Sequence, residues 1–413
     1  MRPGFLHALG VCLLGAALVT TSAMAPAKAA AEFPINTFTA GSQSLPSVTR
    51  LSDGSVVVVW TSYLQDGAEN GIYGQRYRAN GAALGAEFRV NKVTAFDEAI
   101  PDVAALAGGG FVVVWDSSAE GGGEYDVHGQ RYAASGAKAG VAFRVNTFRT
   151  GSQSKSRVAG LADGGFVVVW HGDRGDGMER DVYGQRYDSD GVRARTEFRV
   201  NQVRERDQNA AAVAGLAGGG FVVVWQSYVQ NGADAKTDVY GRRYNTNGVA
   251  VAAGEFRVHT ETFGEQYQPR IAALTGGGFV VIWTHDPNSN SSPVEMIGRL
   301  FSASAAKIGT EFTVNSTFQG IKDLPDVAAL STGGFVVVWQ VMNALNDPWQ
   351  GVFGRRFSSA AEGMGGDFHV NQTTADYQTM PAVAELPNGQ FFVVWDSYLQ
   401  DGSESGVFGR RMR

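Results

Sequence analysis

The sequence predicts an all-β protein, a seven-bladed β-propeller of four-stranded antiparallel blades, and three observations lead to this fold class. One apolar run of the type "GGFVVVW" recurs in seven copies, at spacings of 55, 55, 55, 58, 56 and 56 residues. Each interval holds four short strand signals, which is typical of a propeller blade. The chain also ends after a seventh third strand, while an unpaired copy of the fourth strand precedes the first unit.

Within a unit, each strand has its own pattern. The first reads like "PDVAAL" (101–106), the second is the run "GFVVVW", the third reads like "VYGQRY" (182–187), and the fourth like "EFRVN" (197–201). The second strand does not alternate, so we expect both of its faces to be covered and its terminal tryptophan to be buried. A glycine at a fixed place between the first two strands predicts a tight hairpin with positive φ.

The displaced fourth strand predicts how the ring closes. "EFPIN" (32–36) stands before the first unit, and the last third strand occupies 407–412. We expect Phe33–Asn36 to pair beside that strand and so complete blade 7, which leaves no open edge. The identical segments "SYLQDG" at 62–67 and 397–402 then lie in adjacent blades. An open row of sandwich or solenoid units would not explain the displaced strand.

The first residues predict export from the cell. Arg2, the apolar stretch 8–19 and two small-x-small sites at 23–25 and 27–29 form a secretory signal peptide, 1–29, before a single propeller domain, 30–413. We therefore expect a secreted or periplasmic protein with no membrane span in the mature chain. Cleavage takes away Cys12, so no disulfide forms, and lowers the net charge from −6 to −8. A negative net charge argues against a nucleic-acid partner.

The motifs "GGFVVVW", "VYGQRY" and "EFRVN" resemble a repeat found in secreted bacterial proteins, some of them large calcium-dependent or adhesive proteins. The resemblance covers residues 32–413 and implies a propeller, but it carries no catalytic residues to this chain. No cofactor is predicted firmly, and Ca²⁺ stays an open alternative. The oligomeric state is not predicted.

Variable loops on a rigid scaffold are the usual place for binding, and here the loops between second and third strands vary most. A polar residue follows each blade tryptophan: Thr61, Asp116, His171, Gln226, Thr284, Gln340 and Asp396. Asp116, His171, Asp173 and Asp396 could meet near the axis as metal ligands or as an acid/base group. The alternative is that these residues cap strand ends, since no spacing matches a known ligand motif.

The same loops carry aromatic residues beside carboxylates. Tyr63 with Asp66, and Tyr398 with Asp401, are predicted to lie side by side where blade 7 meets blade 1. Tyr228 repeats the tyrosine in blade 4, and Trp349 has no counterpart in other blades. Aromatic faces beside acidic groups suit sugar binding, while the alternative is that the tyrosines only cover blade edges. An "RGD" at 174–176 is a weak adhesion signal.

The sequence holds no nucleophile elbow, phosphate loop or zinc motif. The preferred function is therefore a secreted, non-catalytic module that binds a glycan or another surface polymer. A polysaccharide lyase or hydrolase is the first alternative, with a base such as His171 or His285. A structural or adhesive role is the second.

Overall fold

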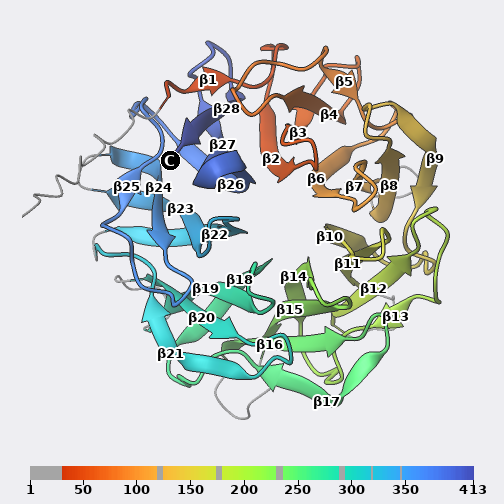
Figure 1. Ribbon diagram of the computed structural model, residues 1–413. Helices are drawn as coiled ribbons and strands as arrows, with labels where there is room; N and C mark the ends of the chain where they lie inside the picture. Colours follow the sequence, from red (N-terminus) through yellow and green to blue (C-terminus); the bar gives the residue numbers. More distant parts are fainter. Residues whose placement is uncertain are drawn as a thin grey trace, which may run out of the picture.

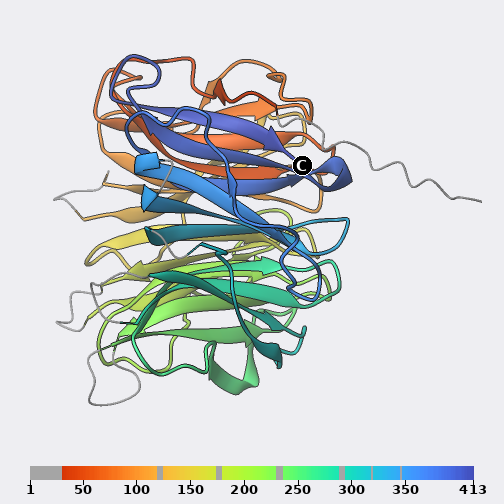
Figure 2. The same ribbon diagram turned by 90° about the vertical axis from the view of Figure 1, so that its left-hand side faces the viewer.

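The protein forms a closed ring of seven four-stranded antiparallel sheets, which confirms the predicted fold class (Figure 1). The computed structural model describes residues 30–118, 124–173, 179–228, 236–287, 294–317, 320–344 and 347–413. No helix in these ranges is long and apolar enough to cross a membrane. Figure 2 shows the ring from the side, with the strands crossing its thickness and the loops at its two faces.

Every blade runs from an inner first strand to an outer fourth strand. Blades 1 to 4 consist of β2(Gln43–Arg50), β3(Val56–Tyr63), β4(Asn70–Tyr77), β5(Phe88–Arg89); β6(Glu98–Ala105), β7(Phe111–Ser117), β8(Asp126–Tyr132), β9(Lys138–Arg144); β10(Gln153–Gly160), β11(Phe166–Gly172), β12(Asp181–Tyr187), β13(Phe198–Arg199); and β14(Gln208–Gly215), β15(Phe221–Tyr228), β16(Thr237–Tyr244), β17(Ala250–Arg257).

The remaining blades follow the same order, and blade 7 takes its outer strand from the start of the chain. Blades 5 to 7 consist of β18(Glu265–Ala273), β19(Phe279–Asp286), β20(Glu295–Phe301), β21(Lys307–Thr313); β22(Ile321–Ala329), β23(Phe335–Ala344), β24(Asp347–Phe357), β25(Phe368–His369); and β26(Gln378–Leu386), β27(Gln390–Tyr398), β28(Ser405–Met412), β1(Phe33–Pro34). One short 3-10 turn, Pro387–Gly389, joins β26 to β27.

The ring closes as predicted. Strand β1 pairs antiparallel with β28, with Phe33 opposite Gly409 and Pro34 opposite Phe408. The amide of Ile35 continues the ladder by donating to the carbonyl of Val407 at 2.8 Å. The Phe33 ring packs against Phe392 of blade 7 and Tyr77 of blade 1, at centroid distances of 5.8 and 5.7 Å. The first strand therefore joins both blades of the seam.

The second strands form the core. The seven blade tryptophans are at most 2% exposed, which confirms that they are not ligand platforms. Hydrophobic clusters cross each blade boundary; one of them joins Val58 and Trp60 of blade 1 to Phe392 and Val394 of blade 7. The hairpin glycines adopt positive φ as expected, for example 81° at Gly54, whose amide donates to Leu51 at 3.0 Å.

The recurring positions of the "EFRVN" motif hold the framework together. The asparagine accepts the first amide of the third strand and donates to the next loop; Asn201 accepts from Val182 N at 2.8 Å and donates to Val203 O at 2.6 Å. The glutamate binds the preceding blade, as Glu197 does by accepting from Thr147 N at 2.7 Å. These motif residues are therefore structural.

Candidate functional site

Four of the polar residues that follow the blade tryptophans, Asp116, Gln226, Gln340 and Asp396, accept a backbone amide of the next blade. In all seven blades the first strand is interrupted by a bulge, and the bulged residue has positive φ: Leu45, Ile100, Lys155, Ala210, Gln268, Leu324 and Met380. Asp116 of blade 2 accepts from Lys155 N of blade 3 at 2.6 Å, and Asp396 of blade 7 accepts from Leu45 N of blade 1 at 3.2 Å. The carboxylates thus cap backbone groups that the bulges leave without strand partners.

Burial changes the protonation of these groups. It raises the pKa of Asp116 to about 7, against the lowering effect of its hydrogen bonds to Lys155 and Ser156. Burial also raises the pKa of Asp396 well above its ordinary value. The pKa of His171 falls to about 3, because of burial first and the positive charge of Lys155 next.

The predicted metal group does not assemble. Asp116 contacts blade 3 and Asp396 contacts blade 1, while His171 Nε2 lies 3.1 Å from Ser154 Oγ within its own blade. The amide of Asp173 is bonded to the carbonyl of Ser152 at 3.0 Å. Within the described ranges, no three His, Cys, Asp or Glu side chains are placed to hold a metal ion together. Asp116 and Asp396 are buried, and both accept backbone amides at the strand bulges of a neighbouring blade.

The tyrosines do reach the surface. Tyr63, Tyr228 and Tyr398 are 38%, 39% and 40% exposed at the ends of β3, β15 and β27. Next to two of them, Leu64 and Leu399 are 46% and 48% exposed. We call Tyr63, Leu64, Tyr398 and Leu399 the seam surface.

One loop, residues 36–42, connects the two halves of the seam surface. Asn36 Nδ2 lies 3.5 Å from Asp401 Oδ2, and a Cβ added at Gly41 would lie 3.4 Å from the Tyr63 ring. The Tyr398 ring meets Tyr377, itself 44% exposed, edge-on at a centroid distance of 6.3 Å. Closure therefore brings the two "SYLQDG" copies to opposite sides of one short loop.

The acidic residues of these loops are placed differently from the prediction. The Asp66 side chain is only 3% exposed and lies 3.6 Å from Arg89 Nη1. Asp401 is partly buried, and accepts from Ser403 N at 3.2 Å. Asp66 therefore lies buried beside Arg89 of β5 and does not stand beside Tyr63 on the surface. The Trp349 side chain and the "RGD" segment lie outside the described residues.

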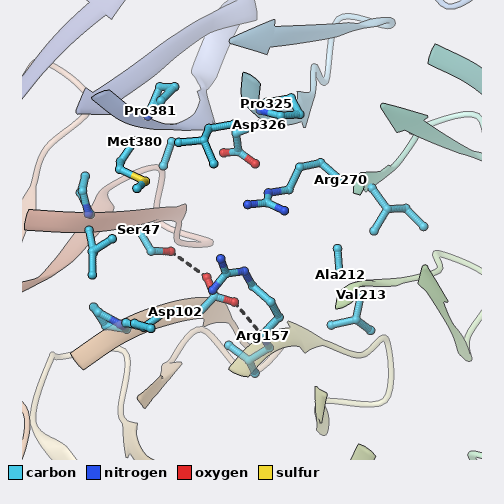
Figure 3. Close-up of a pocket in the computed structure, with 18 residues that line it drawn as sticks. Ser47, Asp102, Arg157, Ala212, Val213, Arg270, Pro325, Asp326, Met380 and Pro381 are labelled. Atoms are coloured by element: carbon cyan, nitrogen blue, oxygen red, sulfur yellow. Dashed lines mark hydrogen bonds between the residues drawn. The ribbon is translucent and has the colours of Figure 1, made fainter. Parts of the chain in front are cut away.

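Sequence reasoning missed a set of side chains on the ring axis. One position of each first strand lines a cavity of about 200 Å³: Ser47, Asp102, Arg157, Ala212, Arg270, Asp326 and Ala382. Figure 3 shows Asp102, Arg157, Arg270 and Asp326 directed into this axial cavity. The only sequence signal is one column of the aligned repeats, which holds four charged residues and three small ones.

No family model and no curated protein matches the chain. Among solved structures, it is similar to a protein of unknown function from Dyadobacter fermentans, with TM-score 0.55, 8% identity and coverage of 93% of this chain and 98% of the other. Two further similar structures are an α-L-arabinanase from Penicillium chrysogenum (12% identity) and a GH93 α-L-arabinofuranosidase from Fusarium graminearum (10% identity). Each gives a TM-score of 0.49, and each alignment covers 94% of this chain and 98% of the other chain. These likenesses concern the fold alone.

Proposed function

We propose that this protein is an exported, non-catalytic module that binds a glycan or a related surface polymer on the face bearing the seam surface. The observation that carries the proposal is the exposure of Tyr63 and Tyr398, 38% and 40%, on the two sides of one loop. A tyrosine offers a flat apolar ring with a hydroxyl at its edge, which suits the mixed apolar and polar surface of a sugar.

The surroundings of the tyrosines favour binding over chemistry. The acidic residues of the same two loops are already engaged: Asp66 lies beside Arg89 of β5, and Asp401 accepts from Ser403 N. Asp116 and Asp396 accept backbone amides of neighbouring blades. A rigid aromatic surface remains that can contact a polymer without reacting with it.

The test is a glycan array, run with and without Ca²⁺, followed by titration calorimetry on any hit. The double variant Tyr63→Ala with Tyr398→Ala should weaken binding at least about tenfold, because aromatic anchors carry much of the energy of a recognition surface. Its melting temperature should hardly change, since both side chains are exposed. Phe263→Ala is the matched control: Phe263 is 56% exposed but lies in the loop before blade 5. Unchanged binding in the double variant would contradict the proposal and favour a structural or adhesive role.

One observation favours the enzyme alternative. Burial raises the pKa of Asp326, on the axis, to about 6, so that this carboxyl could carry a proton near neutral pH as a general acid does. His171 is less suited as a base, because a pKa of about 3 makes the imidazole weakly basic. Polysaccharide cleavage that disappears in Asp326→Asn, while the fold is kept, would support this alternative.

A further inference from the structure

Two arginines enter the axial cavity without closing an ion pair. Arg157 Nη1 donates to the carbonyl of Ser156 at 3.1 Å, and Arg270 Nη1 donates to that of Pro269 at 3.0 Å. No carboxylate of the described chain forms an ion pair with either guanidinium. Since a guanidinium carries five N–H donors, most donors of both side chains are left for a ligand in the cavity.

The two positive charges also repel each other. The pKa of Arg270 falls to about 10, because of burial first and the charge of Arg157 next. The negative charges of Asp326 and Asp102 raise the pKa of Arg270, but the pKa stays below its ordinary value. An anion between the two guanidinium groups would relieve the repulsion, and the interaction would be stronger here than in bulk water because both side chains are partly buried.

The rest of the cavity offers acceptors and space. Asp102 and Asp326 each use one carboxylate oxygen to accept a backbone amide, from Val158 and Val383, at 2.8 Å. Their remaining lone pairs can accept hydroxyl groups, and the Ser47 hydroxyl already donates to Asp102 at 2.8 Å (Figure 3). The other blades contribute small residues, such as Ala212 and Ala382, and the volume of about 200 Å³ is many times what one water needs.

We propose that the axial cavity binds a sugar acid of the hexuronate class, whose carboxylate lies between Arg157 and Arg270 and whose hydroxyls donate to Asp102 and Asp326. Arginine pairs recognise carboxylates through paired N–H donors, and carboxylates are strong acceptors for hydroxyls. A neutral sugar would leave the arginines unpaired, and a bare oxyanion would leave the aspartates unused. The site shares no residue with the seam surface, so it is independent of the proposed function.

The test is titration calorimetry of the purified protein with glucuronate, galacturonate, glucose and inorganic phosphate at one ionic strength. We expect saturable binding of at least one uronate and no binding of glucose. Arg157→Gln and Arg270→Gln should each weaken uronate binding at least about tenfold. Thermal unfolding of each variant checks that the fold is kept, because each change also removes an attraction to a carboxylate, of Asp116 for Arg157 and of Asp326 for Arg270.

The matched control is Arg50→Gln, which removes the same charge from the same inner layer of strands. Arg50 ends β2, forms an ion pair with Glu385 at 2.9 Å and does not line the axial cavity, so uronate binding should be unchanged. The proposal is overturned if wild type binds neither uronate, if phosphate binds and the uronates do not, or if Arg270→Gln behaves like Arg50→Gln.

Discussion

At the scale of single residues, one first-strand position, 17 residues before the tryptophan, supplies the hydrogen-bond partner of the indole N–H in several blades. In blades 3, 4 and 5 the indole N–H donates to a glutamine at 3.0, 3.0 and 2.8 Å. Blade 2 places Glu98 there, and blade 6 places Lys322, which is fully buried. Burial raises the pKa of Glu98 to about 7, although bonds from Ser117 and Trp115 lower it.

The first prediction concerns this glutamate. Its pKa in the folded protein lies above the ordinary 4.5, so the stability that protonated Glu98 provides is lost as the pH rises from about 4.5 to about 7. Glu98→Gln should therefore raise the free energy of unfolding by up to roughly 3 kcal/mol at pH 8 and change it little at pH 4. Urea unfolding at both pH values measures this. The reciprocal variant Gln208→Glu should lose stability at pH 8, and equal effects at both pH values would contradict the explanation.

A second residue-scale prediction concerns the tryptophans themselves. Trp170 is fully buried and its indole N–H donates to Gln153 at 3.0 Å, so Trp170→Ala removes both packing and a satisfied donor. We expect a loss of roughly 3–5 kcal/mol in the free energy of unfolding. Denaturant unfolding checks this value, and a loss below about 1 kcal/mol would mean that the core relaxes around the missing side chain.

At the scale of strands and loops, the sequence predicted which segments pair but not which side chains face the axis. The repeat period and the displaced "EFPIN" were sufficient for the blades and their closure. The first strands instead carry a bulge with positive φ at residues such as Leu45 and Met380, which are not typical of that conformation. Side-chain direction past a bulge does not follow simple alternation. The sequence pattern therefore did not predict that the side chains of Asp102 and Arg157 face the axis.

The asparagine of the "EFRVN" motif gives a prediction at this scale. Asn201 is 1% exposed and satisfies the buried amide of Val182 as well as the carbonyl of Val203. Asn201→Ala leaves the Val182 N–H without a partner and should cost roughly 1–3 kcal/mol. Thermal and urea unfolding measure the loss. Asn247→Ala, at an exposed turn position, is the control and should stay within about 0.5 kcal/mol of wild type.

At the scale of the whole molecule, closure depends on a very short strand. β1 has two paired residues, yet the segment around it also supplies the buried Ile35, the Phe33 ring between two blades, and Asn36, whose Oδ1 accepts from Val407 N at 2.7 Å. Tyr77 of blade 1 donates its hydroxyl to the Ile35 carbonyl at 2.8 Å. The seam between the ends of the chain is thus held by side chains more than by strand length.

Removal of residues 30–36 should therefore open the ring rather than only trim its edge. Loss of Ile35 and Phe33 alone should cost roughly 3–5 kcal/mol, because full burial of such a side chain stabilises by about 1.5–3 kcal/mol and Phe33 is partly buried. The edge of β28 would then be free to pair with other molecules, so aggregation on heating should accompany the fall in melting temperature. Differential scanning calorimetry and light scattering on chains 30–413 and 37–413 test both effects.

A milder pair of variants, Ile35→Ala and Pro34→Ala, separates packing from strand pairing. Ile35 is 1% exposed whereas Pro34 is exposed, so only Ile35→Ala should lower the melting temperature clearly. If chain 37–413 melted like chain 30–413 without aggregation, blade 7 would be stable with three strands and the seam would not limit stability.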